Sequence, residues 1–273
     1  MNGSGRMQRI IHTVVPGVLA LCCLLTAQAL AQVEKAEEKG LRIALDASAR
    51  IDGFGNFTAE MTMLLRDRKG RETRRQMRLK VLEVDGDGDK SLFVFDQPRD
   101  VRGTALLNHS HVNTDDDQWL YLPALKRVKR INSSSRSGAF MGSEFTYEDM
   151  STPEVEEFTY RYLRDEPCGE FTCTVTEQVP LDEKSGYSRK VVWQDTVELR
   201  TWKVELFDRR NSHLKTLSFA DYGLYLDEFW RAGEMTMVNH LTGKSTVLQW
   251  TNFRFRTSID DSEFTQTALR RVR

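Results

Sequence analysis

The chain has 273 residues, of which 39 are Lys or Arg and 40 are Asp or Glu, so its formal net charge at pH 7 is −1. This near-neutral balance argues against a nucleic-acid-binding surface, which requires a strongly basic face. Only the N-terminal segment approaches the roughly 20 apolar residues that a bilayer crossing needs, and no linker or low-complexity segment divides the rest.

The first residues have the pattern of a cleavable secretion signal. Arg6 and Arg9 precede an almost wholly apolar run over residues 10–27, and residues 29–31 (Ala-Leu-Ala) fit the small-x-small cleavage pattern. A signal anchor is the alternative, which the cleavage pattern disfavours. We therefore predict a signal peptide over residues 1–31 and a soluble periplasmic protein.

Residues 32–273 are predicted to form a single domain that begins with a helix. Apolar residues recur at helical spacing over Glu34–Ile51, and Gly53 and Gly55 mark the end of that helix.

Strict alternation of apolar and polar residues follows, which is typical of half-buried strands. Odd positions over residues 57–65 are apolar, and the same alternation recurs in later segments. The residues that we expect to share a face are Met77, Leu79 and Val81; Phe171, Cys173, Val175 and Val179; Trp202, Val204 and Leu206; and Met235, Met237 and Leu241.

Short connections rich in turn residues join these segments, at 67–70, 85–89, 208–212 and 242–244. Consecutive strands are therefore expected to pair as hairpins, about ten strands in all by this pattern. The predicted fold class is mainly β (α+β), a single strongly curved antiparallel sheet or incomplete β-barrel covered by helices.

Two further segments stand apart from the strands. Ser133–Met150 begins with small polar residues and continues through large apolar ones, which we interpret as a mobile flap with an apolar underside. Near the C-terminus, Asp260 and Glu263 resemble a helix capping box before Leu269.

Cys168 and Cys173 are the only cysteines after the leader, and they bracket four residues. In an oxidising compartment this spacing predicts a small disulfide loop. Two free thiols on a metal are the alternative, but no histidine lies near them in the sequence.

Two long motifs carry a resemblance to a known family. They are QWLYLPALKRVKRI over residues 118–131 and GAFMGSEFTYED over residues 138–149. Further matching segments lie at 90–95, 100–107, 185–188, 215–217 and 242–246, so the resemblance covers essentially the mature chain. The sequence resembles the outer membrane lipoprotein-sorting protein family.

The resemblance implies a LolA-like fold, in which a curved sheet with helices over its mouth holds acyl chains in a hydrophobic cavity. It also implies association with an inner-membrane transporter of the resistance-nodulation-division (RND) type. The cargo implied is a lipid or the acyl chains of a lipoprotein, with transient membrane contact.

Large apolar residues are the candidates for the lipid-binding cavity or its lid. Aromatic residues and methionines suit a pocket that accepts variable chains, although a sheet core uses the same residues. The candidates are Phe93, Phe95, Trp119, Tyr121 and Trp193 on strands, Met61, Met63, Met235 and Met237 on strands, and Phe140, Met141 and Phe145 in the flap.

Lys126, Arg127, Lys129 and Arg130 form the densest run of positive charge. A solvated strand explains such a run, and a docking site for anionic headgroups or an acidic partner is the functional alternative. Val128 interrupts the run, which favours an edge or rim position.

We expect no metal site and no cofactor. His109 and His111 share a strand face but make only two ligands, and residues 85–89 lack the glycine of a calcium loop. Nothing resembles a nucleophile elbow or a phosphate-binding loop, so we expect no enzyme. The leading hypothesis is a lipid carrier, and the alternative is an accessory protein of an exporter that uses its cavity only as core.

Overall fold

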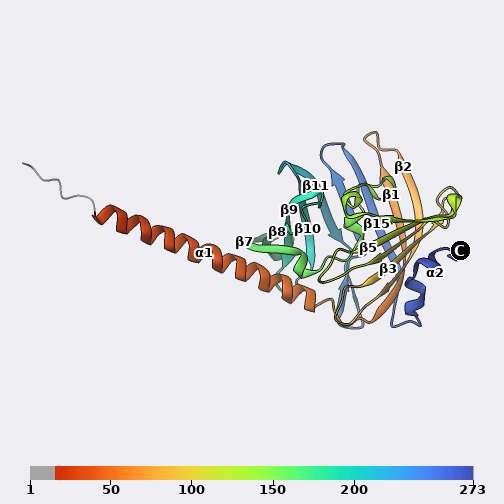
Figure 1. Ribbon diagram of the computed structural model, residues 1–273, viewed down its shortest axis with the longest axis horizontal. Helices are drawn as coiled ribbons and strands as arrows, with labels where there is room; N and C mark the ends of the chain where they lie inside the picture. The colour runs from red at the N-terminus through yellow and green to blue at the C-terminus, as the bar shows by residue number, and fades with distance from the viewer. Residues whose placement is uncertain (1–15, 273) are drawn as a thin grey trace, which may run out of the picture.

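The computed structural model describes residues 16–272, with side chains from residue 32 onward. One 13-stranded antiparallel sheet dominates the fold (Figure 1), in the order β6-β5-β4-β3-β2-β1-β15-β14-β11-β10-β9-β8-β7. Its strands are β1 (Asn56–Arg66), β2 (Glu72–Leu82), β3 (Lys90–Gln97), β4 (Ala105–His109), β5 (Asp117–Leu122), β6 (Arg127–Ile131), β7 (Phe158–Cys168), β8 (Phe171–Pro180), β9 (Tyr187–Asp195), β10 (Thr201–Asp208), β11 (His213–Ala220), β14 (Glu234–Asn239) and β15 (Lys244–Phe255).

The first and last strands meet in the middle of this sheet. β1 pairs with β2 on one side and with β15 on the other, for example Met61 with Met77 and with Trp250. The sheet is therefore two meanders joined by the β1–β15 pairing, and it remains open, with edges at β6 and β7. The mainly β, strongly curved and incompletely closed sheet is as predicted.

The estimate of about ten strands was too low, because residues 16–272 already form 15. Two predicted strand faces were also wrong. A register shift between Thr201 and Lys203 moves Trp202 away from Val204, so that Trp202 packs in a separate cluster on the outer face. Leu241 lies beyond the end of β14 in a turn and is 68% exposed.

Helix α1 (Pro16–Ala49) covers the edge strand β7 (Figure 1). It begins earlier than the predicted helical segment and ends at Ala49, two residues before the predicted end at Ile51. The charged start of the predicted leader lies outside the described residues. A Cβ on Gly40 would stand 2.8 Å from the backbone of Arg161 and Tyr162, so only glycine permits this close approach. Covering an edge strand protects its unpaired backbone groups.

The C-terminal segment packs on the opposite face of the sheet from the main core. The predicted capping box of Asp260 and Glu263 is present at a 3₁₀ turn, Asp261–Phe264, and α2 (Gln266–Leu269) follows. Phe264 and Leu269 are buried against Leu107 in a second apolar cluster. Within the part of the chain whose side chains are described, no helix is long and apolar enough to cross a bilayer.

Residues 132–157 connect β6 to β7 and so join the two edges of the sheet. They include the predicted flap, Ser133–Met150, and the whole connection is hereafter called the flap. The flap has little regular structure beyond short 3₁₀ turns. These are Ser133–Ser135, Phe140–Gly142, Glu148–Met150 and Val155–Glu157, in addition to Pro123–Leu125 before β6.

Two smaller features complete the fold. Strands β12 (Gly223–Tyr225) and β13 (Phe229–Arg231) form a separate hairpin between β11 and β14. Cys168 and Cys173 form the predicted disulfide, which closes the β7–β8 turn.

Candidate functional site

The concave face of the sheet carries the largest apolar cluster of the molecule. Leu106 on β4 and Val192 on β9 belong to this same cluster, although seven strands separate β4 from β9 in the sheet order. Side chains that far apart along a sheet can only share a cluster on the inside of its curve. The face that carries them is therefore the concave one.

Methionine is concentrated on this face. All seven methionines after residue 15 belong to the concave cluster or pack against it, and the two other apolar clusters contain none. The thioether side chain is flexible and repacks easily around different partners. The seven are Met61, Met63, Met77, Met141, Met150, Met235 and Met237.

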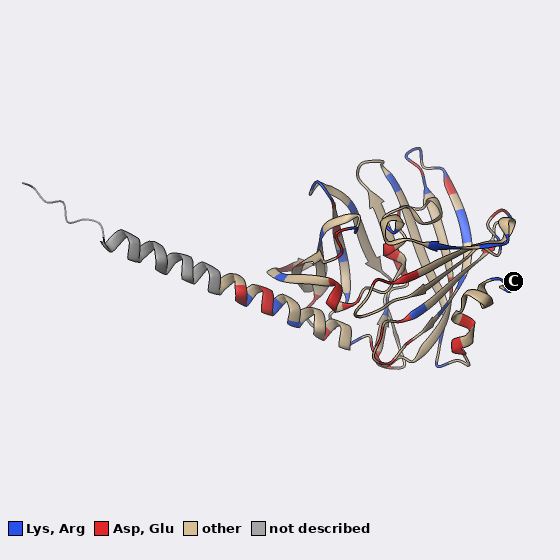
Figure 2. Cartoon of the chain, in the orientation of Figure 1, with Lys and Arg blue, Asp and Glu red and all other residues tan. Residues whose placement is uncertain are grey.

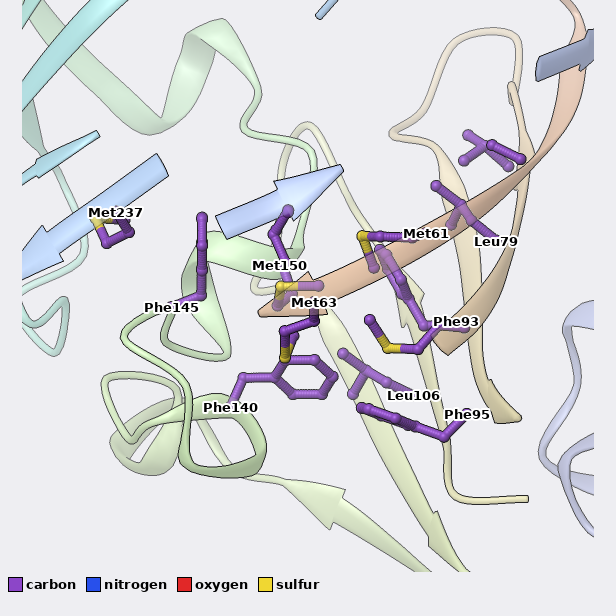
Figure 3. Packing of buried hydrophobic residues seen from close by; sticks show 14 of the residues in the cluster. Met61, Met63, Leu79, Phe93, Phe95, Leu106, Phe140, Phe145, Met150 and Met237 are labelled. Carbon is purple, nitrogen blue, oxygen red and sulfur yellow. The ribbon is translucent and has the colours of Figure 1, made fainter. Parts of the chain in front are cut away.

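The flap fills the concave face (Figure 3). Phe140 and Phe145 are 0% and 2% exposed, and in the close view Phe140 lies beside Met63 while Phe145 lies between Met237 and Met150. The Phe140 ring centroid lies 5.8 Å from that of Phe95 on β3. The apolar underside that the sequence predicts is present, and it occupies the space that a ligand on the concave face would need.

Hydrogen bonds from β4 and β5 hold one part of the flap. The Asn108 side-chain amide donates to the carbonyl of Met150 at 2.8 Å, and the Gln118 amide donates to the carbonyl of Tyr147 at 2.8 Å. Both amides are fully buried. Buried polar groups of this kind are costly without a partner, so these bonds fix where the flap lies.

A second set of polar contacts joins the flap to the other half of the sheet. Tyr187 on β9 donates its hydroxyl hydrogen to Asp149 at 2.9 Å and accepts a hydrogen bond from the Lys215 ammonium at 3.2 Å. Burial, followed by the charge of Asp149, raises the pKa of the Tyr187 hydroxyl well above its usual value. The Asn239 amide donates to Glu144 at 2.7 Å.

The tip of the flap is held by one arginine. Arg75 on β2 donates to the carbonyl of Met141, a residue with φ of 49°, and burial lowers the pKa of its guanidinium. A surface pocket of about 420 Å³ opens beside this tip, with Leu65, Gly142 and Thr246 among its lining residues. The predicted mobility of the flap stays a prediction, and its contacts in this structure are many.

A second group of aromatic side chains extends the concave cluster at the other end. Phe229 of the β12–β13 hairpin is 1% exposed, and its ring lies 6.5 Å from Phe54 and 6.4 Å from Phe255. Tyr225 packs on Phe253 at 4.9 Å. The hairpin therefore also packs against the concave cluster, near Phe54, Phe253 and Phe255.

Nine of the twelve predicted cavity or lid residues come together in the concave cluster. These are Met61, Met63, Phe93, Phe95, Phe140, Met141, Phe145, Met235 and Met237. The other three do not. Trp119 and Tyr121 lie on the convex face beneath the C-terminal segment, and Trp193 lies in the third cluster with Cys173.

The predicted basic run lies on and beside β6, which is an edge strand. Lys126, Arg127 and Lys129 are exposed, whereas Arg130 forms an ion pair with Asp117. An edge position agrees with the sequence pattern. A docking role for these residues stays a prediction.

The two histidines have separate partners. The His109 ring nitrogen Nε2 contacts the carbonyl of Phe264 at 2.8 Å, and His111 Nδ1 contacts Asp87 at 2.8 Å. Among residues with described side chains, no group of three or more His, Cys, Asp or Glu has the arrangement of a metal site.

Two solved structures are closely similar to this chain in fold. An outer membrane lipoprotein-sorting protein domain from Vibrio parahaemolyticus is 52% identical, with a TM-score of 0.84 over 86% of this chain and 99% of that one. A DUF1329 family protein from Desulfovibrio piger is 29% identical, with a TM-score of 0.81 over 86% and 99% of the two chains. A family model described as an uncharacterized protein matches residues 87–271, and no curated protein matches.

A more distant match defines the fold class. A LolA superfamily protein from Nitrosomonas europaea is 19% identical, with a TM-score of 0.68 over 83% of this chain and 97% of that one. The fold is thus LolA-like. Given the 52% identity to the Vibrio domain over most of its length, the chain belongs to the outer membrane lipoprotein-sorting protein family.

Proposed function

We propose that this protein is a periplasmic carrier that binds a lipid, or the acyl chains of a lipoprotein, on the concave face of its sheet. One observation carries the proposal: all seven methionines with a described side chain meet at the concave face, five on its strands and two, Met141 and Met150, in the flap that covers it. A surface of adaptable side chains suits acyl chains of differing length. The family supports lipoprotein sorting as the setting.

In this proposal the flap and the cargo compete for one space. Phe140 and Phe145 lie buried against the concave face in this structure. An acyl chain that binds there takes their place. Each buried methylene contributes roughly 0.8 kcal/mol, so a dozen supply on the order of 10 kcal/mol before ordering costs. That amount offsets the loss of several flap contacts and still leaves reversible binding.

The carrier receives its cargo from a membrane-bound protein, and we propose an RND-type inner-membrane transporter as that partner. No catalytic step is needed for this role. The alternative is an accessory protein of an exporter, in which the flap is a permanent part of the core. The many hydrogen bonds that hold the flap favour this alternative.

Probe binding to two matched phenylalanine variants separates these functions. Phe140→Ala removes a fully buried ring beneath the flap, and Phe264→Ala removes an equally buried ring on the convex face. Each destabilises the fold by about 3–5 kcal/mol. A carrier should bind a fluorescent fatty acid, and Phe140→Ala should bind it more tightly because the ring no longer competes.

Phe264→Ala should bind the probe as the parent protein does. The measurement is a fluorescence titration at a temperature where both variants remain folded by circular dichroism. Failure of the parent protein and of Phe140→Ala to bind any fatty-acid probe would refute the carrier proposal and support the accessory role.

A further inference from the structure

The turns at the two ends of the sheet differ in charge. Antiparallel pairing places alternate turns at the same end. One end, hereafter the basic end, contains nine Lys or Arg, three Asp and one Glu in its six turns. Those turns are residues 67–71, 98–104, 123–126, 181–186, 209–212 and 240–243.

The opposite end, hereafter the acidic end, contains eleven Asp or Glu and two Arg in its five connections. Figure 2 shows blue at the β1–β2 and β10–β11 turns, drawn at the top, and red among the connections drawn below. The five connections are residues 83–89, 110–116, 169–170, 196–200 and 221–233. The near-neutral net charge therefore conceals a strongly polarised molecule.

Most cations of the basic end are available to a partner. They are exposed, and within the described part of the chain their side chains have no ion pair or hydrogen bond. Arg71 is an exception because it pairs with Asp67. The available cations are Arg68, Lys69, Arg99, Lys126, Lys184, Arg209 and Arg210.

Three exposed leucines lie in the turns of the basic end. Leu125 on the β5–β6 turn is 63% exposed, Leu241 on the β14–β15 turn is 68% exposed, and Leu181 on the β8–β9 turn is 59% exposed. Apolar side chains at turn tips beside unpaired cations match the chemistry of a bilayer surface, where headgroup phosphates lie above acyl chains. An acidic protein partner would account for the cations but would leave these leucines unexplained.

We propose that the basic end docks on an anionic lipid bilayer, with Leu125 and Leu241 entering the headgroup region. Repulsion between the lipid charge and the acidic end gives the docked molecule one orientation. The pocket beside the flap tip includes Gly142, Asp67 and Lys244, so it opens at the basic end. Docking therefore brings the rim of the concave face to the membrane, although it does not depend on the proposed function.

Vesicle binding by the full protein, recovered from cells without detergent, tests this proposal. Flotation with mixed phosphatidylglycerol–phosphatidylcholine vesicles should retain the protein at low salt, and pure phosphatidylcholine vesicles should not. Each surface cation contributes about a fivefold gain in binding, so Lys69→Glu with Arg210→Glu should weaken it by about twentyfold or more. Raising the salt concentration should have the same effect.

The matched control reverses two exposed cations on α1, Lys35→Glu with Arg42→Glu. It changes the net charge by the same amount and should bind as the parent protein does. Equal loss in the two double variants would show that overall charge, and not the basic end, governs binding, and would overturn the proposal.

Tryptophan placement tests the orientation. In the Leu241→Trp variant, binding to anionic vesicles should shift the fluorescence emission of the introduced tryptophan to shorter wavelength. Brominated lipids in the same vesicles should quench that emission. Val197→Trp is the control, because Val197 is 65% exposed in a turn of the acidic end. A shift at position 197 and not at 241, or no binding to either vesicle, would refute docking through the basic end. Fatty-acid binding in solution is measured without vesicles, so failure here leaves the carrier proposal to its own test.

Discussion

Tyr187 attaches the flap to the β9 side of the sheet. Its hydroxyl group lies between the carboxylate of Asp149 on the flap and the ammonium of Lys215 on β11. Tyr187 and Lys215 are buried beneath the flap, where water cannot readily replace a lost partner. Removing the hydroxyl group therefore weakens the flap without altering the apolar lining.

Tyr187→Phe should lower the free energy of unfolding by about 1–3 kcal/mol, because Asp149 and Lys215 each lose a hydrogen-bond partner. It should also accelerate fatty-acid binding, since the flap opens more often. Denaturant titration and stopped-flow fluorescence measure the two effects. Tyr160→Phe is the control, because Tyr160 is buried and its hydroxyl group makes no hydrogen bond with the described residues. A destabilised Tyr187→Phe protein with an unchanged binding rate would show that the flap does not gate the site.

The residue types at the site were predictable, whereas its polar contacts were not. Met61 and Met63 alternate within one strand, so a single segment of sequence identifies them as facing inward. Tyr187, Asp149 and Lys215 come from two strands and a flap, and no spacing in the sequence relates them. Only the curvature of the sheet brings them together. An unusual polar residue on an otherwise apolar face, as Lys215 is on the face of β11 that carries Leu217 and Phe219, is the only signal available.

Among the elements, the β7–β8 hairpin is the one that most needs stabilising contacts outside the sheet. β7 is an edge strand of the sheet, protected by α1 on its free side and by a disulfide at its turn. A loop of this size restricts the unfolded chain enough to contribute about 2 kcal/mol.

Cys168→Ser with Cys173→Ser should therefore unfold at lower denaturant, with a stability loss of about 2 kcal/mol. Adding a reducing agent should bring the parent protein to the same midpoint and should not affect the double variant. A parent protein whose denaturant midpoint does not respond to reduction would contradict this contribution.

Alternation predicted the strands but could not assign their faces. In β5, Gln118, Trp119, Leu120 and Tyr121 are all buried, because the flap covers one face and the C-terminal segment covers the other. Trp119 and Tyr121 were thus predicted as cavity candidates although they face the convex side. Packing on both faces removes the polar signal that distinguishes inside from outside.

At the scale of the whole molecule, carboxylates gather where α1, the β2–β3 turn and the end of the flap meet. Burial, followed by the charges of Glu83 and Asp52, raises the pKa of Asp89 to about 7. Burial and the charge of Asp89 likewise raise the pKa of Glu154 to about 7. A carboxyl group whose pKa is higher in the folded than in the unfolded state favours folding when protonated.

Stability should therefore fall as the pH rises from about 4 through 7 and should be lowest above 7. Between pH 6 and pH 8 the loss due to Asp89 is about 1 kcal/mol, or a decrease of a few degrees in Tm. Asp89→Asn should raise Tm at pH 8 and flatten the dependence of Tm on pH in thermal unfolding followed by circular dichroism. A steeper dependence in that variant would show that another group dominates.

The connection of the flap to both sheet edges also limits how the site can open. A lid with one hinge swings aside and leaves its frame unchanged. Residues 132–157 instead run from β6 at one edge of the open sheet to β7 at the other, so they connect the two edges. Lifting the flap away from the concave face shortens the distance that it can bridge and so pulls the two edges together. A bulky ligand that pushes the edges apart must, conversely, stretch the flap. In the proposed carrier, the distance between the two edges of the sheet therefore sets an upper limit on the size of the cargo, and the length of the flap, rather than the shape of a pocket, fixes that limit.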